Sequence, residues 1–240
     1  INYKSNEDID FSQDLEEKTP TALEKFSLEL PSTELTIKEK ILSPSAISLF
    51  EECQKKFEYK YVFNMPDKIT TSWDSLKLGS FIHLILEQGV KNNLKKLEEF
   101  INLAKDLKSK EEWESINLEE TLPLIKIFYE RNKNKYSKNS LTEQPLFMNL
   151  FGLKFVGVAD RIDFHPEGLE IIDYKTGKTV PAGKELNIQL GYYALAAKKL
   201  GKIHKITLEV LQNPYPLEFT VKDNGDVISL TSNRLVFNIH

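Results

Sequence analysis

The spacing of apolar residues changes character at about residue 140 of this chain. Earlier segments carry apolar residues at helical spacing, which predicts helices over residues 44–63, 75–90, 94–107 and 118–136. Later segments alternate or are continuously apolar over short runs, which predicts strands over residues 147–150, 154–164, 169–175, 205–211, 217–222 and 227–230. A further helix over residues 184–200 interrupts the strands. This order predicts an α/β or α+β domain, with a small mixed β-sheet flanked by helices and a helical N-terminal part.

The first part of the chain differs from the rest in its charge. Residues 1–40 contain ten acidic and five basic residues, and residues 1–42 contain no glycine and only weak periodicity. We interpret residues 1–42 as an acidic linker or arm, with one short helix over residues 21–28, and residues 43–240 as the folded domain. Because the chain begins with Ile1 rather than Met, we expect it to be a piece of a longer polypeptide or a processed product.

Composition and charge argue against several classes of protein. The formal net charge of −4 argues against a protein that coats nucleic acid through bulk charge, and the local lysine clusters are typical of solvated helix faces. The single cysteine, Cys53, cannot form an internal disulfide and cannot alone ligate zinc or an iron–sulfur cluster. The cysteine content fits a reducing compartment. Since no apolar stretch is long enough to cross a bilayer and the first residues are polar, we expect a cytoplasmic protein without a membrane partner.

Two neighbouring predicted strands each place an acidic residue on an apolar face. Alternate residues of a strand share a face. The first such face is formed by Val156, Val158, Asp160 and Ile162, and the second by Leu169, Ile171, Asp173 and Lys175. Residues 166–168 have the composition of a hairpin turn, so we expect the strands to pair antiparallel and to bring Asp160 close to Asp173.

Burial of a lone carboxylate costs several kcal/mol, so each acid needs a partner. One solution is a plain salt bridge, between Asp173 and Lys175 or between Asp160 and Arg161. The other is a divalent cation, since two converging carboxylates with room for water suit Mg²⁺ or Mn²⁺. In that case Lys175, on the face of Asp173, would point at the water or phosphate beside the metal. Spacing alone leaves both solutions open.

The two strands resemble the core of the PD-(D/E)XK nuclease superfamily. The string Gly157-Val158-Ala159-Asp160-Arg161-Ile162-Asp163 followed by Ile171-Ile172-Asp173-Tyr174-Lys175-Thr176-Gly177 is similar to the RecB/AddB branch. This resemblance covers residues 43–222 and includes residues 43–61, which resemble the first helix of RecB-like domains. It implies a restriction-endonuclease-like core within residues 43–240. An acid-x-Lys pattern alone is common by chance, whereas the two extended strings together are specific.

Two helical patterns extend the resemblance. Gln189 and Tyr193 share a helix face and match a Gln-x-x-x-Tyr element that implies contact with DNA near the site. Gly79 and His83 match a Gly-x-x-x-His pattern that implies a metal-binding histidine, and Glu87 lies one turn further along. On a helix without such a match, these residues would ordinarily be surface or packing residues.

The resemblance implies a role for each site residue. Asp160, Asp173 and Lys175 would be catalytic, and His83, Asp160, Asp173 and the backbone carbonyl of Tyr174 would hold Mg²⁺ or Mn²⁺. Glu143 and Arg161 are further candidates. Many relatives hold an iron–sulfur cluster through four cysteines, but Cys53 matches only the first of these positions, so we expect no cluster and read Cys53 as a small apolar residue in a helix.

The expected activity is Mg²⁺- or Mn²⁺-dependent hydrolysis of DNA phosphodiesters. By resemblance, we expect an exonuclease of DNA repair or recombination that acts on single strands or duplex ends and is fused to or associated with a helicase. One alternative is an inactive nuclease-like module that binds DNA or serves as a scaffold. Another is a plain α/β interaction domain whose motif matches are accidental.

Overall fold

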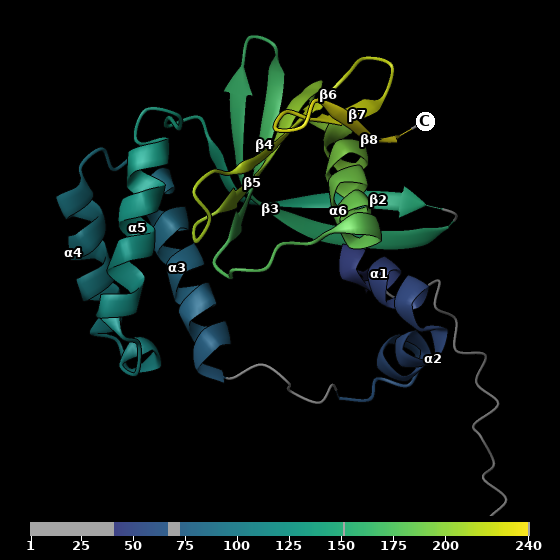
Figure 1. Ribbon diagram of the computed structural model, residues 1–240. Coiled ribbons are helices and arrows are strands. Elements are labelled where there is room, and N and C mark those ends of the chain that lie inside the picture. The colour runs from purple at the N-terminus through teal and green to yellow at the C-terminus, as the bar shows by residue number, and fades with distance from the viewer. Residues whose placement is uncertain (1–40, 67–72, 151, 240) are drawn as a thin grey trace, which may run out of the picture. The chain divides into compact units, whose positions relative to one another are not determined.

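The computed structural model describes residues 41–66, 73–150 and 152–239 (Figure 1). The helices are α1 (Pro44–Glu52), α2 (Gln54–Phe57), the π-helical turn η2 (Glu58–Val62), α3 (Trp73–Lys91), α4 (Leu97–Lys108), the 3₁₀ turn η3 (Glu111–Trp113), α5 (Leu118–Asn132), α6 (Gly183–Ala196) and the 3₁₀ turn η4 (Ala197–Lys199). The strands are β1 (Ile41–Leu42), β2 (Leu141–Leu150), β3 (Leu153–His165), β4 (Gly168–Lys175), β5 (Ile203–Val210), β6 (Leu217–Val221), β7 (Asp226–Ser229) and β8 (Arg234–Asn238).

The strands form one mixed sheet in the order β1-β3-β4-β5-β6-β7-β8, with β2 paired to β3. The β3–β4 and β2–β3 pairs are antiparallel, whereas β4 and β5 run parallel and are joined through α6. A parallel pair needs a crossover connection, and a helix that packs back on the sheet provides it. Strands β6, β7 and β8 continue the sheet from β5 as an antiparallel meander.

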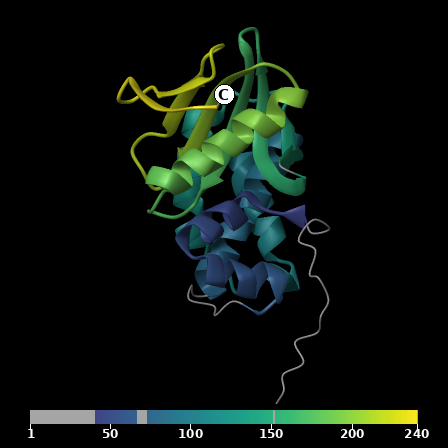
Figure 2. The same ribbon diagram turned by 90° about the vertical axis from the view of Figure 1, so that its right-hand side faces the viewer.

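Helices cover both faces of the sheet (Figures 1 and 2). On one face, α6 and α1 pack over the apolar side chains of the strands, including Ile162, Ile171 and Leu208. On the other face, α3, α4 and α5 bury Ile172 and Tyr174 of β4. Helices α3 and α4 approach closely at Gly89, where a Cβ atom would lie 2.0 Å from the ring of Phe100. The fold is a mixed sheet between two helical layers, which confirms the predicted restriction-endonuclease-like α/β class.

The predicted helices α3, α4, α5 and α6 are present with end shifts of a few residues. The predicted helix over residues 44–63 is wrong as a single helix, because Cys53 adopts an extended conformation (φ −159°, ψ 107°) between α1 and α2. Cys53 therefore lies between helices and not within one, and its side chain is half-buried. The expected proline at the first helical position, Pro44, begins α1.

The strand predictions identified the central strands of the sheet, but they missed two short strands and part of β2. Strand β2 begins at Leu141 rather than at Phe147, and β8 was not predicted. Ile41 and Leu42, which the sequence analysis assigned to the arm, form β1 and pair in parallel with β3. Residues 1–40, including the predicted helix at 21–28, lie outside the described residues. Within the described residues, no helix is long and apolar enough to span a membrane.

Candidate metal centre and active site

Strands β3 and β4 separate at the two predicted acidic residues. Their antiparallel ladder runs from His165 opposite Gly168 to Arg161 opposite Ile172, and it ends there. The next position on β3 is Asp160 and the next on β4 is Asp173. Beyond that point β4 stays paired with β5, while β3 stays paired with β2. This fork places two carboxylates at the point where the two strands diverge.

The carboxylate of Asp160 spans the opening of the fork. Its Oδ2 accepts a hydrogen bond of 2.5 Å from the backbone amide of Tyr174, and its Oδ1 lies 3.1 Å from His83 Nδ1. Asp160 thus contacts both β4 and helix α3. Its side chain is mostly buried but retains access to solvent.

The direction of Asp160 follows from an irregularity in β3. Ala159 and Ile162 both belong to the hydrophobic cluster under α6, although they are three positions apart in the strand. Strict alternation would place them on opposite faces, so the alternation changes phase at Asp160 and Arg161. The predicted common face of Asp160 and Ile162 is therefore wrong. By contrast, Asp173 and Ile171 of β4 do share the α6 face, as predicted.

Glu143 of β2 stands opposite this irregularity. Its neighbours Thr142 and Gln144 pair with Arg161 and Ala159, which places Glu143 across from Asp160. Glu143 has φ +47°, a left-handed conformation that is uncommon for a residue with a side chain and that costs of order 1–3 kcal/mol. Such strain is often found at functional sites. The kink lets the Glu143 carboxylate join the Asp160 carboxylate on the α3 side.

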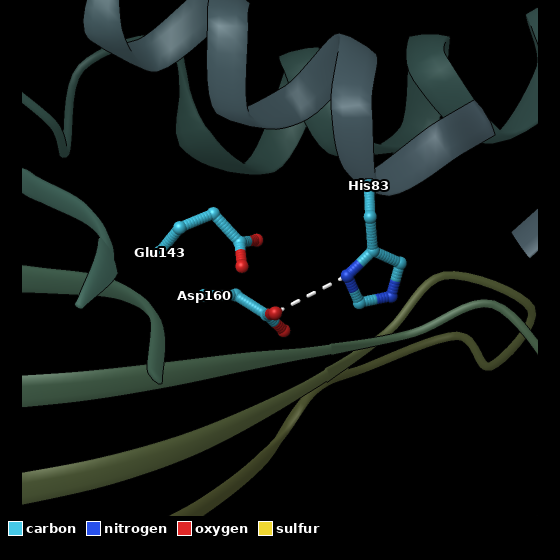
Figure 3. A group of neighbouring side chains, drawn as sticks. All are labelled: His83, Glu143 and Asp160. Atoms are coloured by element: carbon cyan, nitrogen blue, oxygen red, sulfur yellow. Dashed lines mark hydrogen bonds and ion pairs between the residues drawn. The ribbon is translucent and has the colours of Figure 1, made fainter. Parts of the chain in front are cut away.

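Helix α3 supplies the third member of this group. Potential ligand atoms of His83, Glu143 and Asp160 all lie within 4.8 Å of one another. In Figure 3 the histidine reaches from α3 toward the two carboxylates. One turn before His83, Gly79 lies so close to the segment after β4 that a Cβ atom would be 3.2 Å from Thr176 Oγ1. The absence of a side chain at Gly79 thus leaves room for α3 to lie this close to Thr176.

Asp173 is held by three side chains. Its Oδ2 forms a 2.7 Å ion pair with Lys175 Nζ, and its Oδ1 accepts hydrogen bonds from Tyr193 Oη (2.6 Å) and Gln189 Nε2 (3.0 Å). The Asp173–Lys175 salt bridge considered from the sequence is therefore present. The other one is not, since the guanidinium of Arg161 pairs with Asp163 at 3.1 Å.

The environment shifts the pKa values of several site groups. Burial and the charge of Asp160 raise the pKa of Asp173, although Lys175 and Tyr193 act in the opposite direction. Burial, Asp160 and Glu87 raise the pKa of Glu143. For His83, burial lowers the pKa, but the hydrogen bond to Asp160 and the surrounding negative charges outweigh it, so the pKa is raised. Unfavourable negative charge thus accumulates at the fork, as a site for a cation requires.

Among the residues that the structure describes, two cavities border the fork. The first, about 630 Å³, is lined by His83, Asp160 and the acidic residues Glu87, Glu112 and Glu143. The second, about 280 Å³, is lined by Lys175, Gln189 and Tyr193 together with Ser45 and Ser48 of α1. An acidic cavity therefore adjoins Asp160, and a second cavity between α1 and α6 gives access to Lys175.

The donor set fits a divalent cation. Two carboxylates and an imidazole converge, and oxygen-rich sites of this kind suit Mg²⁺ or Mn²⁺ better than soft metals. The predicted residues fall into two contact groups on either side of the fork. His83 and Asp160 lie on the α3 side with Glu143, which was only a candidate. Asp173 lies on the α6 side, in contact with Lys175, Gln189 and Tyr193. Arg161 faces away from the fork into the interior, where only 1% of its side chain is exposed. Glu112 was not singled out because it lies far from the strand motifs in sequence.

Comparison with known families agrees with this geometry. Residues 41–215 match the profile of the PD-(D/E)XK nuclease superfamily, and this match covers most of the chain. The chain therefore belongs to the PD-(D/E)XK nuclease superfamily, whose members are generally metal-dependent nucleases that bind DNA. No curated protein matches the chain.

Proposed function

We propose that this protein is a Mg²⁺- or Mn²⁺-dependent deoxyribonuclease of the RecB-like branch, without an iron–sulfur cluster. The observation that carries the proposal is the fork between β3 and β4, where Asp160 and Asp173 diverge beside Lys175 and His83. A plain structural salt bridge would explain Lys175 and Asp173, but it would not explain the strained Glu143 beside Asp160 and His83.

Each residue of the fork has a distinct role in this proposal. His83, Asp160, Asp173 and the backbone carbonyl of Tyr174 would hold the cation, and Glu143 would add a further carboxylate on the His83 side. When bound, the divalent cation lowers the pKa of a coordinated water and neutralises charge on the phosphate. Lys175 orients the attacking water or donates to a phosphate oxygen, which stabilises the charge that develops there.

Lys175 and Asp173 must change partners for this chemistry. In the described structure the ammonium of Lys175 lies 2.7 Å from Asp173. A cation held by Asp173 would compensate the charge of its carboxylate, and the ammonium of Lys175 would then be available to a phosphate. The cavity beside Lys175 gives the substrate access to the ammonium group.

The assignment to the RecB-like branch rests on the helices. Gln189 and Tyr193 lie on α6, donate hydrogen bonds to Asp173 and line the same cavity as Lys175, which supports the match to the Gln-x-x-x-Tyr pattern of this branch. We propose that they also orient the DNA strand beside the cleaved bond. The wider context that this branch suggests is exonuclease action in DNA repair or recombination, a fused or associated helicase, and a cytoplasmic location.

Digestion of end-labelled oligonucleotides tests the activity and its polarity together. Single-stranded and duplex substrates are incubated with Mg²⁺, with Mn²⁺ and with EDTA, and product lengths are measured over time. We expect metal-dependent cleavage that EDTA stops and that the Asp173→Ala variant lacks. Short products released progressively from one end would identify an exonuclease. Equal cleavage with and without metal would contradict the proposal.

One observation favours the alternative of an inactive DNA-binding or scaffolding module. The Asp173–Lys175 ion pair already compensates both charges without a metal. Thermal unfolding separates the two functions, because a ligand that binds only the folded state raises its melting temperature. Stabilisation by Mn²⁺ together with cleavage supports the nuclease, whereas an unchanged melting temperature and intact DNA would favour the module.

A further inference from the structure

A buried arginine lies directly behind the fork and has no part in the chemistry described so far. Arg161 follows Asp160 in β3, and its side chain is 1% exposed. Its guanidinium donates to Tyr174 Oη (3.1 Å) and to Asn132 Oδ1 of α5 (2.9 Å), and its Nε lies 3.1 Å from Asp163 Oδ2. Hydrogen bonds thus hold the two terminal nitrogens of the guanidinium, and the third nitrogen lies in an ion pair without a hydrogen bond.

The partners of Arg161 are themselves anchored in the scaffold. Asp163 accepts a 2.6 Å hydrogen bond from Ser140. Asn132 donates to Glu209 of β5 (3.2 Å), and Glu209 forms a 2.7 Å ion pair with Arg131 of α5. The guanidinium is thereby held between α5, β3 and β5, and it can act as a fixed point for what it touches.

Tyr174 connects this fixed point to the fork. Its phenol accepts from Arg161, while its backbone amide donates to Asp160 Oδ2 at 2.5 Å. Its ring packs edge-on against the ring of His83, with 5.9 Å between centroids. Asp173 and Lys175 are its neighbours in the chain. A shift of Tyr174 would therefore move four groups of the site at once.

Burying the charged side chain of Arg161 is energetically unfavourable. Isolated from water, a guanidinium loses several kcal/mol of hydration, and well-packed apolar residues at such positions often give equal or greater stability. A planar guanidinium does, however, hold several partners in fixed directions, which an apolar side chain cannot do. The arrangement around Arg161 fits a need for precise placement better than a need for stability alone.

We propose that Arg161 is a positioning residue, which acts through the phenol of Tyr174 to fix the Tyr174 amide against Asp160 and so sets the geometry of the cation site. The proposal rests on the proposed nuclease function for its kinetic consequence. Its structural consequence, a fixed Tyr174 amide, exists in the metal-free protein and does not depend on that function.

The variant Tyr174→Phe removes only the phenol oxygen and retains the ring. Tyr136→Phe is a matched control, because both tyrosines are 3% exposed and both rings lie within 6.0 Å of the Arg161 guanidinium carbon, at 5.8 Å for Tyr174 and 5.9 Å for Tyr136. Tyr136 donates instead to the backbone of Leu94, away from the fork. Each variant loses one hydrogen bond, a buried one at Tyr174 and a part-buried one at Tyr136, so both lose some stability.

Hydrogen exchange of the metal-free proteins provides the first measurement. We expect Tyr174→Phe to speed exchange of the amide at position 174 by about tenfold or more relative to the amide of Ile172, and Tyr136→Phe to leave that ratio within about twofold. Two further measurements should distinguish the variants. Titration should show that Tyr174→Phe binds Mn²⁺ more weakly, whereas Tyr136→Phe binds it normally. In cleavage assays, only Tyr174→Phe should have a lower kcat, with little change in KM.

Each outcome separates the two proposals. An unchanged exchange ratio at position 174 overturns the positioning role, whatever the activity of the protein. A faster exchange in a protein that never cleaves DNA would overturn the proposed function and leave the positioning role intact. If Tyr174→Phe does not fold, Arg161→Lys serves instead. This variant keeps the buried positive charge but lacks the planar guanidinium that donates to several partners. The same local rise in the exchange rate at position 174 is expected. Uniformly faster exchange along β4 in that variant would indicate a merely structural arginine and overturn the proposal.

Discussion

The carboxylate of Asp160 is hydrogen-bonded to the backbone amide of Tyr174, across the gap where the β3–β4 ladder has ended. This bond replaces the ladder hydrogen bonds that the diverging strands no longer form. It also makes the position of Asp160 depend on the main chain that carries Asp173 and Lys175. The two halves of the candidate metal centre are thus coupled through one short contact.

Replacement of Asp160 by asparagine should abolish catalysis while preserving the fold. Asparagine can still accept from the Tyr174 amide, but it lacks the charge that holds a cation. We expect the rate of Mn²⁺-dependent cleavage to fall about 1,000-fold or more, which corresponds to about 4 kcal/mol of lost transition-state stabilisation. Circular dichroism should be unchanged. A variant that retains near-normal activity would remove Asp160 from the site.

Replacement of Lys175 by methionine should separate catalysis from metal binding. Without the ammonium, the buried Asp173 carboxylate loses its ion-pair partner, so the metal-free protein should unfold at a lower temperature. A cation can then compensate the charge, and the rise in melting temperature on addition of Mn²⁺ should exceed that of the unmodified protein. Cleavage should fall by about 100-fold or more. Loss of the Mn²⁺ effect in this variant would show that Lys175 itself supports binding.

The raised pKa of His83 predicts opposite pH trends for the metal-free and the metal-bound protein. A histidine whose folded pKa exceeds its unfolded value of 6.5 contributes stability that is fully present below pH 6.5 and is lost as the pH rises through the folded pKa. Metal binding requires neutral imidazole, so the stabilisation by Mn²⁺ should instead grow over that range. Melting temperatures from pH 6 to about pH 8.5 check both trends. In the His83→Gln variant, both the melting temperature of the metal-free protein and the stabilisation by Mn²⁺ should depend less on pH. If both pH dependences were unchanged in that variant, they would have to arise from another titratable group.

The hydroxyl of Tyr193 should act on kcat rather than on substrate affinity if its main role is to hold Asp173. The Tyr193→Phe variant loses the 2.6 Å hydrogen bond to Asp173 Oδ1, and we expect kcat to fall about tenfold. Tyr192→Phe is a matched control, since the Tyr192 hydroxyl donates to the backbone of Leu146 instead. A rise in KM with an unchanged kcat would favour the predicted contact with DNA.

Cys53 should be dispensable for activity. An iron–sulfur cluster of the kind found in many relatives needs four thiolate ligands, and the chain contains one cysteine. We expect Cys53→Ala to cleave DNA at the normal rate and to change stability by less than about 1 kcal/mol. Purified protein should contain no stoichiometric iron. Iron that copurifies with the protein and disappears in Cys53→Ala would contradict this prediction.

The sequence indicated which site residues share a face wherever those residues lie on regular elements. Asp173 and Lys175 follow strict alternation in β4, and Gln189 and Tyr193 follow helical spacing in α6, so their common faces could be read directly. The prediction that His83 binds metal depended on the resemblance to a family, since a single histidine on a helix does not by itself indicate a metal site. The Asp173–Lys175 ion pair was one of two open alternatives.

The irregular positions could not be predicted. Alternation assigns Asp160 and Ile162 to one face, and nothing in the residue types signals the change of phase between Ala159 and Ile162. Glu143 is not a residue that usually adopts a positive φ, so the kink opposite Asp160 had no local signal either. The extended conformation of Cys53 is likewise hidden within continuous helical spacing.

Two edges of the sheet were missed for different reasons. Strand β1 has two residues, which is too short for alternation to be recognised. Strand β8 was not predicted because its apolar run, Leu235, Val236 and Phe237, is shorter than the runs of four or more residues that indicate a strand. The proposed arm at residues 1–42 remains a prediction apart from the two residues of β1.

The meander of β6, β7 and β8 has a consequence for the behaviour of the protein in solution. Ile206, Leu208 and Val210 make β5 an apolar strand that, at the edge of a sheet, would be a template for pairing with another molecule. The meander moves the edge to β8, which begins at the charged Arg234, ends at the polar Asn238 and is offset from β7 by a register shift. Irregular edges with charged residues resist strand addition. Strands β6, β7 and β8 thereby reduce the tendency of the sheet to aggregate. We expect deletion of these three strands to give insoluble protein, even though the fork lies elsewhere in the sheet.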